Sequence, residues 1–269
     1  MARWLWYCVN PFQTLLCFVW TVGSILTVGV AMLCGAKPTL GMRAAQRPWS
    51  TVVLWIVGAR LERVGFPESL DGTKLFVANH QSVIDVTVLV RALPPPLHFI
   101  AKTELFRLPI FGWYLRRTGM IPVDRRGGAG RLGLAAAVAR TGGGGIVAFP
   151  EGTRSRDGQL GAFKRGSFAA AIAAQIPVVP IAIENAAQVV GRSGFTGRPG
   201  VIRLHYGREI QTAGLGQSAR GAVADQARDE VARLLGLERG GPASTPQVGR
   251  AVDVDDAPGG EGASFVGQE

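Results

Sequence analysis

The sequence predicts an α/β fold, in which a mixed and largely parallel sheet is flanked by helices and preceded by an N-terminal helical segment. Between residues 75 and 237, short apolar strand-like runs alternate with helix-like runs. This order of elements is typical of a largely parallel sheet with helices on its faces. The chain has 269 residues, of which 47% are hydrophobic and 18% charged, so it can form a sizeable core.

Local patterns predict the individual elements. Residues 75–78 (LFVA) read as a buried strand, and residues 82–93 as a helix that ends at three consecutive prolines. Residues 131–140 form an alanine-rich helical pattern that ends at four consecutive glycines. Further strands are expected at residues 98–101, 120–123, 146–149, 178–184 and 201–206, and further helices before residue 115, at 167–174 and at 219–237.

The N-terminal segment is typical of a membrane anchor. Residues 12–35 form one uncharged apolar run of 24 residues, long enough to cross a hydrocarbon core of about 30 Å as a helix. Lys37, Arg43 and Arg47 follow it, so the positive-inside rule places the rest of the chain at the cytoplasmic face of the cell membrane. A cleaved signal peptide is the alternative, but the run is long and lacks a clear cleavage site.

A second apolar stretch, residues 51–59, is too short to span a bilayer. It is either an interfacial or re-entrant helix or an ordinary core helix of the domain that follows. We assign residues 1–64 to a membrane-anchoring segment and residues 65–239 to the main domain. Residues 240–269 are rich in Gly, Pro, Ser, Asp and Glu, which predicts a disordered tail.

The charge distribution indicates an anionic partner. The formal net charge is +10, and because residues 238–269 carry −4, the rest of the chain carries about +14. Nucleic acid, anionic lipid headgroups and a phosphorylated substrate would all suit this excess, and an inert basic surface is the alternative. Five of the six tryptophans precede residue 56, which is a membrane-interface distribution and argues against nucleic acid.

Cysteine and histidine counts exclude several kinds of chemistry. The three cysteines all lie within the first 34 residues, and the chain has only three histidines. The main domain therefore has no thiol nucleophile, no cysteine zinc site and no disulfide framework. We expect no metal centre.

The candidate general base is His80, which follows a predicted strand, with Asp85 five positions later. A neutral imidazole oriented by a carboxylate can take a proton from an alcohol near neutral pH. In a regular helix the two residues would lie about 140° apart, so pairing requires His80 to precede the helix. The alternative is a capping box, in which Asp85 bonds back to the main chain near Ser82.

A second candidate group follows the strand at residues 146–149. Glu151, Gly152, Thr153 and Arg154 form a compact loop where open α/β sheets place ligands. Arg154 offers a rigid fork of donors for a phosphate, although an internal Glu151–Arg154 pair could simply brace the turn. Lys102 and Arg125 each follow a strand-like run and could reach the same edge.

Four blocks occur in a fixed order: Asn79-His80 with Asp85, Gly119 with Asp124-Arg125, residues 149–155 (FPEGTRS) and residues 176–180 (IPVVP). This order resembles the glycerolipid acyltransferase family, whose best-known members are 1-acylglycerol-3-phosphate acyltransferases. The resemblance covers roughly residues 75–207. Residues 101–105 and 163–166 also match the pattern.

The resemblance implies both the reaction and the roles of the residues. His80, oriented by Asp85, would deprotonate the sn-2 hydroxyl of a lysophosphatidic acid. The alkoxide would attack the thioester of acyl-CoA or acyl carrier protein, giving phosphatidic acid with no acyl-enzyme intermediate and no cofactor. The implied substrate-binding residues are Lys102, Arg125, Glu151, Gly152, Thr153 and Arg154, and Pro177 would lie near the acyl donor.

Two alternatives remain open. The same chemistry could act on another lysophospholipid or on a lyso-aminolipid. A non-catalytic, lipid-binding membrane protein is also conceivable, although the intact pair of His80 and Asp85 argues against it.

Overall fold

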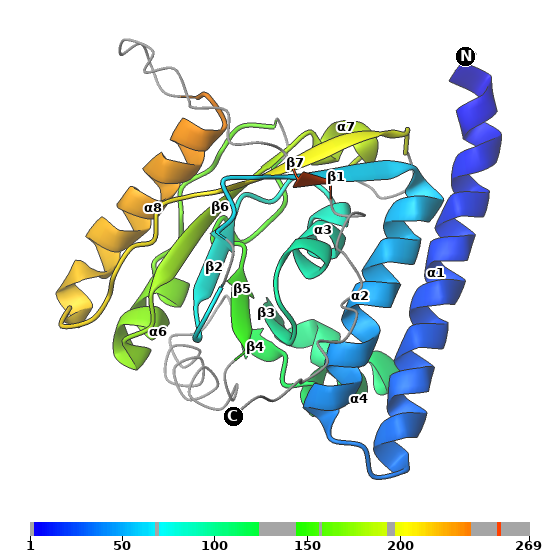
Figure 1. The fold of residues 1–269 in the computed structure, drawn as a ribbon, viewed down its shortest axis with the longest axis horizontal. Coiled ribbons are helices and arrows are strands. Elements are labelled where there is room, and N and C mark those ends of the chain that lie inside the picture. Colours follow the sequence, from blue (N-terminus) through cyan, green and yellow to red (C-terminus); the bar gives the residue numbers. More distant parts are fainter. Residues whose placement is uncertain are drawn as a thin grey trace, which may run out of the picture.

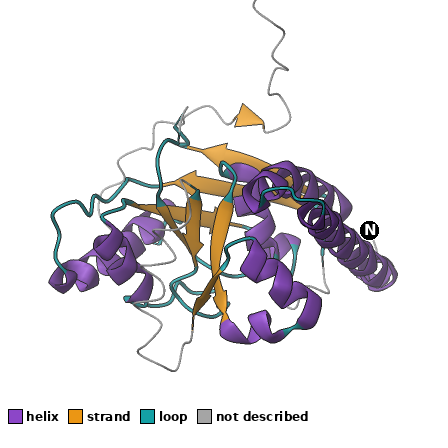
Figure 2. Ribbon diagram, turned by 90° about the horizontal axis from the view of Figure 1, so that it is seen from below, coloured by secondary structure: helices purple, strands orange, loops and turns teal. Residues whose placement is uncertain are grey.

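A computed structural model of the protein describes residues 3–67, 70–123, 144–155, 158–192, 197–237 and 252–253. Within these residues the chain forms a sheet with helices on both faces (Figures 1 and 2). The strands are β1 Ala59–Val64, β2 Leu75–Ala78, β3 Leu97–Lys102, β4 Ile121–Val123, β5 Gly145–Ala148, β6 Val178–Glu184, β7 Gly200–Tyr206 and β8 Val252–Asp253. The helices are α1 Arg3–Leu33, α2 Pro38–Val57, α3 Ile84–Ala92, η1 Thr103–Arg107, α4 Pro109–Arg117, α6 Gly166–Ala174, α7 Ala186–Val189, η2 Gln217–Ala219 and α8 Arg220–Leu234.

The sheet is mixed and largely parallel, which confirms the predicted fold class. Its strand order is β4-β3-β5-β2-β6-β7-β1-β8. The pairs from β4 to β6 are all parallel, as is the pair of β1 with β7, whereas β6–β7 and β1–β8 are antiparallel. The carboxyl ends of β2, β3 and β5 therefore meet at one edge, where open α/β sheets bind ligands.

Two apolar cores fill the space on either side of the sheet. Alternation along β2 shows the arrangement, because Phe76 packs with α2 and α3 on one face while Leu75 and Val77 pack with α6 and α8 on the other. Every residue of β2 and β5 is buried. These uniformly apolar strands have the pattern expected of a parallel sheet covered on both faces.

Helices α1 and α2 lie side by side along one flank of the molecule (Figure 1). Trp49 Nε1 donates to Thr21 Oγ1 at 3.0 Å, and Gln13 Nε2 donates to the carbonyl of Ile56 at 2.8 Å. Within the described residues, Val9–Leu33 is the one stretch long and apolar enough to cross a membrane, with a mean hydropathy of 2.1. Its outer face exposes large apolar side chains, including Phe12, Phe18 and Leu33.

The structure differs from the sequence prediction at the boundary of the main domain. Residues 59–64, which we assigned to the anchor, form β1 and pair with β7. The strand was missed because it alternates buried Leu61 with charged residues, one of which, Glu62, accepts from Arg203 Nε of β7 at 2.8 Å. The stretch before it belongs to α2, whose Val53 is buried in the core that α3 shares. That geometry matches the core-helix alternative for residues 51–57.

The predicted strands of the main domain correspond to β2 to β7, and the helices predicted at 82–93, 167–174 and 219–237 correspond to α3, α6 and α8. The helix expected at residues 131–140 lies outside the described residues. The tail prediction also lies outside them, except at residues 252–253, which form β8. Helix α7 was not predicted, because four residues are too few to show a period.

Asn79 joins the end of β2 to β6 and provides a test of this packing. Its side chain is buried, donates to the carbonyl of Ile183 at 2.9 Å and accepts from the Ile183 N–H at 2.7 Å. Asn79→Ala leaves both main-chain groups without these partners and should lower the free energy of unfolding by about 2–4 kcal/mol. Unfolding of the detergent-solubilised protein measures the change. The control is exposed Gln211→Ala, expected within about 0.5 kcal/mol of wild type, and equal stability of the two variants would contradict the assignment.

Candidate active site

His80 and Asp85 meet at the turn between β2 and α3. His80 Nδ1 lies 2.8 Å from Asp85 Oδ2, and His80 precedes the helix, as pairing requires. The same oxygen accepts the main-chain N–H groups of Gln81 at 2.8 Å and Ser82 at 2.9 Å. The pairing and the capping role, which the sequence presented as alternatives, are therefore both present. The carboxylate is fully buried, while the imidazole keeps 19% of its surface exposed.

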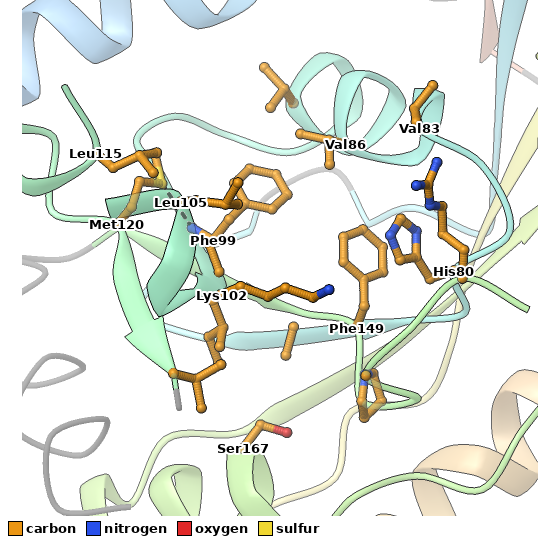
Figure 3. Close-up of a pocket in the computed structure, with 18 of the residues that line it drawn as sticks. His80, Val83, Val86, Phe99, Lys102, Leu105, Leu115, Met120, Phe149 and Ser167 are labelled. Atoms are coloured by element: carbon orange, nitrogen blue, oxygen red, sulfur yellow. Dashed lines mark hydrogen bonds between the residues drawn. The ribbon is translucent and has the colours of Figure 1, made fainter. Parts of the chain in front are cut away.

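This geometry determines which ring nitrogen can act as a base. Asp85 is acceptor-only when ionised, so the nitrogen facing it, Nδ1, carries the hydrogen. The lone pair of the neutral ring then resides on Nε2. The ring of Phe149 stacks on His80, with centroids 4.0 Å apart and an interplanar angle of 18°. Figure 3 shows the two rings face to face at the wall of a cavity.

Glu151 connects the loop after β5 to the loop after β2 through hydrogen bonds. Its Oε1 accepts the main-chain N–H of His80 at 2.8 Å, and its Oε2 accepts that of Gly161 at 3.1 Å. The N–H of Ser155 donates to the carbonyl of His80 at 2.8 Å, so the two loops are joined twice. Burial raises the pKa of the Glu151 carboxyl above its ordinary value, and the two N–H donors partly oppose this shift.

The internal Glu151–Arg154 pair that the sequence allowed is not what braces this turn. Arg154 Nη1 instead donates to the carbonyl of Arg192. Gly152, between them, has φ +80°, and a Cβ there would lie 2.7 Å from Lys164 Nζ. The left-handed backbone favours glycine here, and its lack of a side chain leaves room for the Lys164 ammonium group.

A cavity of about 1120 Å³ opens beside His80. Its apolar walls include Val83, Val86, Phe99, Leu105, Leu115 and Met120, from α3 and the residue before it, β3, η1, α4 and the segment before β4 (Figure 3). Its charged lining residues are Lys102, Arg154, Lys164, Arg165, Arg192 and Arg220. No aspartate or glutamate lines it within the described part of the chain.

Helix α1 also contributes to the cavity, a feature that the sequence did not predict. Thr21, Ser24 and Ile25 line it, together with Trp49 of α2. The stacking of Phe149 on His80 was missed as well. The phenylalanine belongs to a recognised block, but nothing in its spacing from His80 indicates contact between two separate loops.

The structure brings most of the predicted site residues to one edge of the sheet. His80, Gly152, Thr153, Arg154 and Lys102 all line the cavity, with Asp85 and Glu151 bonded directly behind His80. Figure 3 shows the Lys102 side chain extending from the end of β3 toward Phe149.

Two predicted residues are not placed there. Arg125 lies outside the described residues. Pro177 precedes β6, whose Val178 pairs with Leu75 at the start of β2, whereas His80 follows the end of β2. Pro177 therefore lies at the opposite end of these parallel strands and does not line the cavity. Among the described residues, no group of three His, Cys, Asp or Glu side chains could hold a metal ion.

Comparison with known proteins agrees with this architecture. Residues 63–184 match the family described as Acyltransferase. A 1-acyl-sn-glycerol-3-phosphate acyltransferase of Pseudomonas aeruginosa is 31% identical over 225 residues, which cover 78% of this chain and 85% of that protein. The chain belongs to the acyltransferase family.

Other relatives are longer or more distant. A chloroplastic 1-acyl-sn-glycerol-3-phosphate acyltransferase of Brassica napus is 33% identical over 172 residues, which cover 63% of this chain and 48% of that protein. The matched region thus spans about half the length of that relative. The crystal structure of a 1-acyl-sn-glycerophosphate acyltransferase from Thermotoga maritima shares the fold, with a TM-score of 0.67 and 22% identity. The match covers 82% of this chain and 95% of that one.

The tautomer of His80 is directly measurable. The protein is labelled with ¹⁵N-histidine, and long-range ¹H–¹⁵N spectra are recorded at a pH where the His80 ring is neutral. The spectra should show His80 protonated at Nδ1 and unprotonated at Nε2. Only three histidines exist, so loss of one signal set in His80→Gln assigns it. Asp85→Asn, whose amide can also donate, should weaken this preference. A neutral ring found mainly as the Nε2–H form in the wild type would contradict the geometry.

Proposed function

We propose that the protein transfers an acyl group from acyl-CoA or acyl carrier protein to the sn-2 hydroxyl of lysophosphatidic acid, giving phosphatidic acid for phospholipid synthesis. The observation that carries the proposal is a cavity with His80 in its wall, large apolar walls and a cationic lining without acids in the described residues. Lysophosphatidic acid has the same two parts, an acyl chain and a phosphate. The names of the relatives support this acceptor.

The chemistry follows from the tautomer of His80. Its Nε2 takes the proton of the acceptor hydroxyl while the oxygen attacks the carbonyl carbon of the thioester. The tetrahedral intermediate collapses by breaking the carbon–sulfur bond, and the imidazolium returns its proton to the leaving thiolate. Asp85 stabilises the imidazolium through the 2.8 Å contact with Nδ1. Proton transfer of this kind contributes about 10²–10⁴-fold to a rate.

The acceptor phosphate fits the cations nearest to His80. Arg154 offers a guanidinium fork, Lys164 Nζ lies over Gly152, and Lys102 points toward Phe149 in Figure 3. We assign Thr153 and the peptide at Gly152 to the same binding site, and Arg125 on the family resemblance. Glu151 takes a different role, because both its oxygens accept main-chain N–H groups and a carboxylate would repel phosphate. It positions the His80 loop.

Both substrates are amphiphiles, so the position of the site relative to the bilayer matters. Helix α1 is long and apolar enough to cross a membrane and also lines the cavity. We assign α1 as the anchor and place the catalytic domain at the cytoplasmic face, since Lys37, Arg43 and Arg47 follow that helix. In this arrangement a lysolipid reaches the cavity without leaving the membrane interface.

A lyso-aminolipid acceptor fits the cavity less well. Its ammonium group would need an acidic partner, and the described lining offers none. An anionic headgroup instead meets the lining cations nearest to His80, which are Lys102, Arg154 and Lys164. Another lysophospholipid with a phosphodiester carries only one negative charge there, so a phosphate monoester is the best match.

The experiment that tests the proposal is an acceptor panel. Purified wild-type protein receives labelled oleoyl-CoA and one of several lysolipids: lysophosphatidic acid, lysophosphatidylcholine, lysophosphatidylethanolamine or a lyso-aminolipid. Because only the first offers a phosphate monoester, kcat/KM should be at least about tenfold higher for it, equivalent to about 1.4 kcal/mol. A higher kcat/KM for any other acceptor would overturn the assignment.

His80→Ala tests the mechanism separately. The variant should lose at least about 100-fold in kcat, while its thermal midpoint and membrane association stay close to wild type. His205→Ala is the matched control, since His205 pairs with Glu184 at 3.0 Å and does not line the cavity. Substantial turnover by a stable His80→Ala enzyme would exclude His80 as the base.

A further inference from the structure

The cationic lining of the cavity exceeds what one acceptor phosphate needs. Six lysine and arginine side chains line it, and none forms an ion pair within the part of the chain that the structure describes. A phosphate monoester carries at most about −2. Three of the cations, Lys102, Arg154 and Lys164, lie beside the His80 and Phe149 loops and suffice for that charge.

The other cations include two arginines, Arg165 and Arg220, at the N-terminal ends of two helices. Arg165 immediately precedes α6, and Arg220 is the first residue of α8. A Cβ placed on Gly221 would lie 3.4 Å from Arg165 Cζ, so the Arg165 guanidinium rests on the first turn of α8. One Arg220 donor is used, from Nη1 to the carbonyl of Gln217 at 2.9 Å.

This pair is electrostatically unfavourable without an anion. The N-terminal end of a helix carries a partial positive charge, so a cation placed there is repelled. Arg165 and Arg220 each stand at the N-terminal end of a helix, α6 and α8 respectively, and neither helix has an acidic residue in its first turn or a side-chain cap. A bound phosphate would offset the unfavourable interaction of these cations with the helix dipoles.

Ser167 supplies a further donor at the same place. It lines the cavity, and its Oγ is buried with no hydrogen-bond partner among the described residues. In Figure 3 it lies on the side of the cavity away from Val83 and Val86, with Lys102 between. The α6 end of the cavity is therefore distinct from the apolar end.

We infer that Arg165, Arg220 and Ser167 form a second anion subsite, which binds a phosphate of the acyl donor. The inference rests on the proposed function, because a thioester donor that reaches His80 brings its own phosphates into the same cavity. Phosphopantetheine is the part that CoA and acyl carrier protein share, and CoA has additional nucleotide phosphates. The acceptor phosphate stays with Arg154 and Lys164, at the loop that holds His80.

Donor truncation combined with arginine substitution tests this subsite. The full chain in detergent is compared as wild type, Arg165→Gln, Arg220→Gln and the double variant. The donors are oleoyl-CoA, oleoyl-4′-phosphopantetheine and oleoyl-pantetheine, with saturating lysophosphatidic acid. The double variant should raise the KM for a phosphorylated donor about tenfold or more. The KM for oleoyl-pantetheine and for lysophosphatidic acid should change less than about twofold, because neither bonds to this pair.

Two further variants serve as controls. Arg208→Gln removes an exposed arginine that lies near Glu230, in the C-terminal half of α8, and does not line the cavity. It should leave every KM near wild type. Arg154→Gln should instead raise the KM for lysophosphatidic acid. Thermal midpoints close to wild type show that the variants are folded.

The possible outcomes distinguish a failure of the proposed donor subsite from a failure of the proposed function. An effect on both phosphorylated donors assigns the subsite to the phosphate of the pantetheine arm, and an effect on oleoyl-CoA alone assigns it to the nucleotide phosphates. An equal effect on oleoyl-pantetheine, or a raised KM for lysophosphatidic acid alone, overturns the inference. If the wild type acylates a different acceptor, the proposed acceptor is wrong, and the donor comparison proceeds with that acceptor.

Discussion

The geometry of the candidate active site depends on one buried carboxylate oxygen. Asp85 is fully buried, and its Oδ2 accepts hydrogen bonds from the His80 ring and from the N–H groups of Gln81 and Ser82. A buried charge is costly unless hydrogen bonds compensate it. These three donors on Oδ2 offset part of that cost, although Oδ1 is buried with no hydrogen-bond partner among the described residues, and they hold residues 80–82 in a non-helical turn. The start of α3 and the orientation of the imidazole are thus consequences of the same interaction.

The second constraint is the connection between the two loops that follow the neighbouring strands β2 and β5. Glu151 and Ser155 bond to the main chain of His80 from the β5 side, and Phe149 stacks on its ring. The imidazole is therefore packed against an aromatic ring and bonded to Asp85, while Glu151 and Ser155 hold the main chain of the same residue. Preorganisation of this kind lowers the reorganisation that a proton transfer would otherwise require. Both Glu151 oxygens accept main-chain N–H groups and Glu151 does not line the cavity, so its carboxylate is compatible with the proposed phosphate site nearby.

The sequence predicted the centre of the fold better than its periphery. Strands β2 and β6 were predicted to the residue, because their runs are uniformly apolar and end at clear polar or proline boundaries. Strand β1 was missed because its charged face pairs with Arg203, a partner about 140 positions away. The pairing of His80 with Asp85 is local and could be predicted. The partners of Glu151 are main-chain groups on other loops, and the position of Pro177 depends on strand direction, so block order alone could predict neither.

The N-terminal helix α1 contributes side chains to the cavity. Because Thr21, Ser24 and Ile25 form part of the wall, α1 belongs to the candidate active-site cavity as well as serving as the anchor we assign. Removing α1 to obtain a water-soluble fragment would delete that wall and expose the cavity to solvent on one side. Such a fragment could retain the sheet and both loops intact and still differ from the parent in which acyl chains it accepts. The acyl-chain selectivity measured on such a fragment would reflect a cavity that lacks one wall, and it could not be attributed to the native protein.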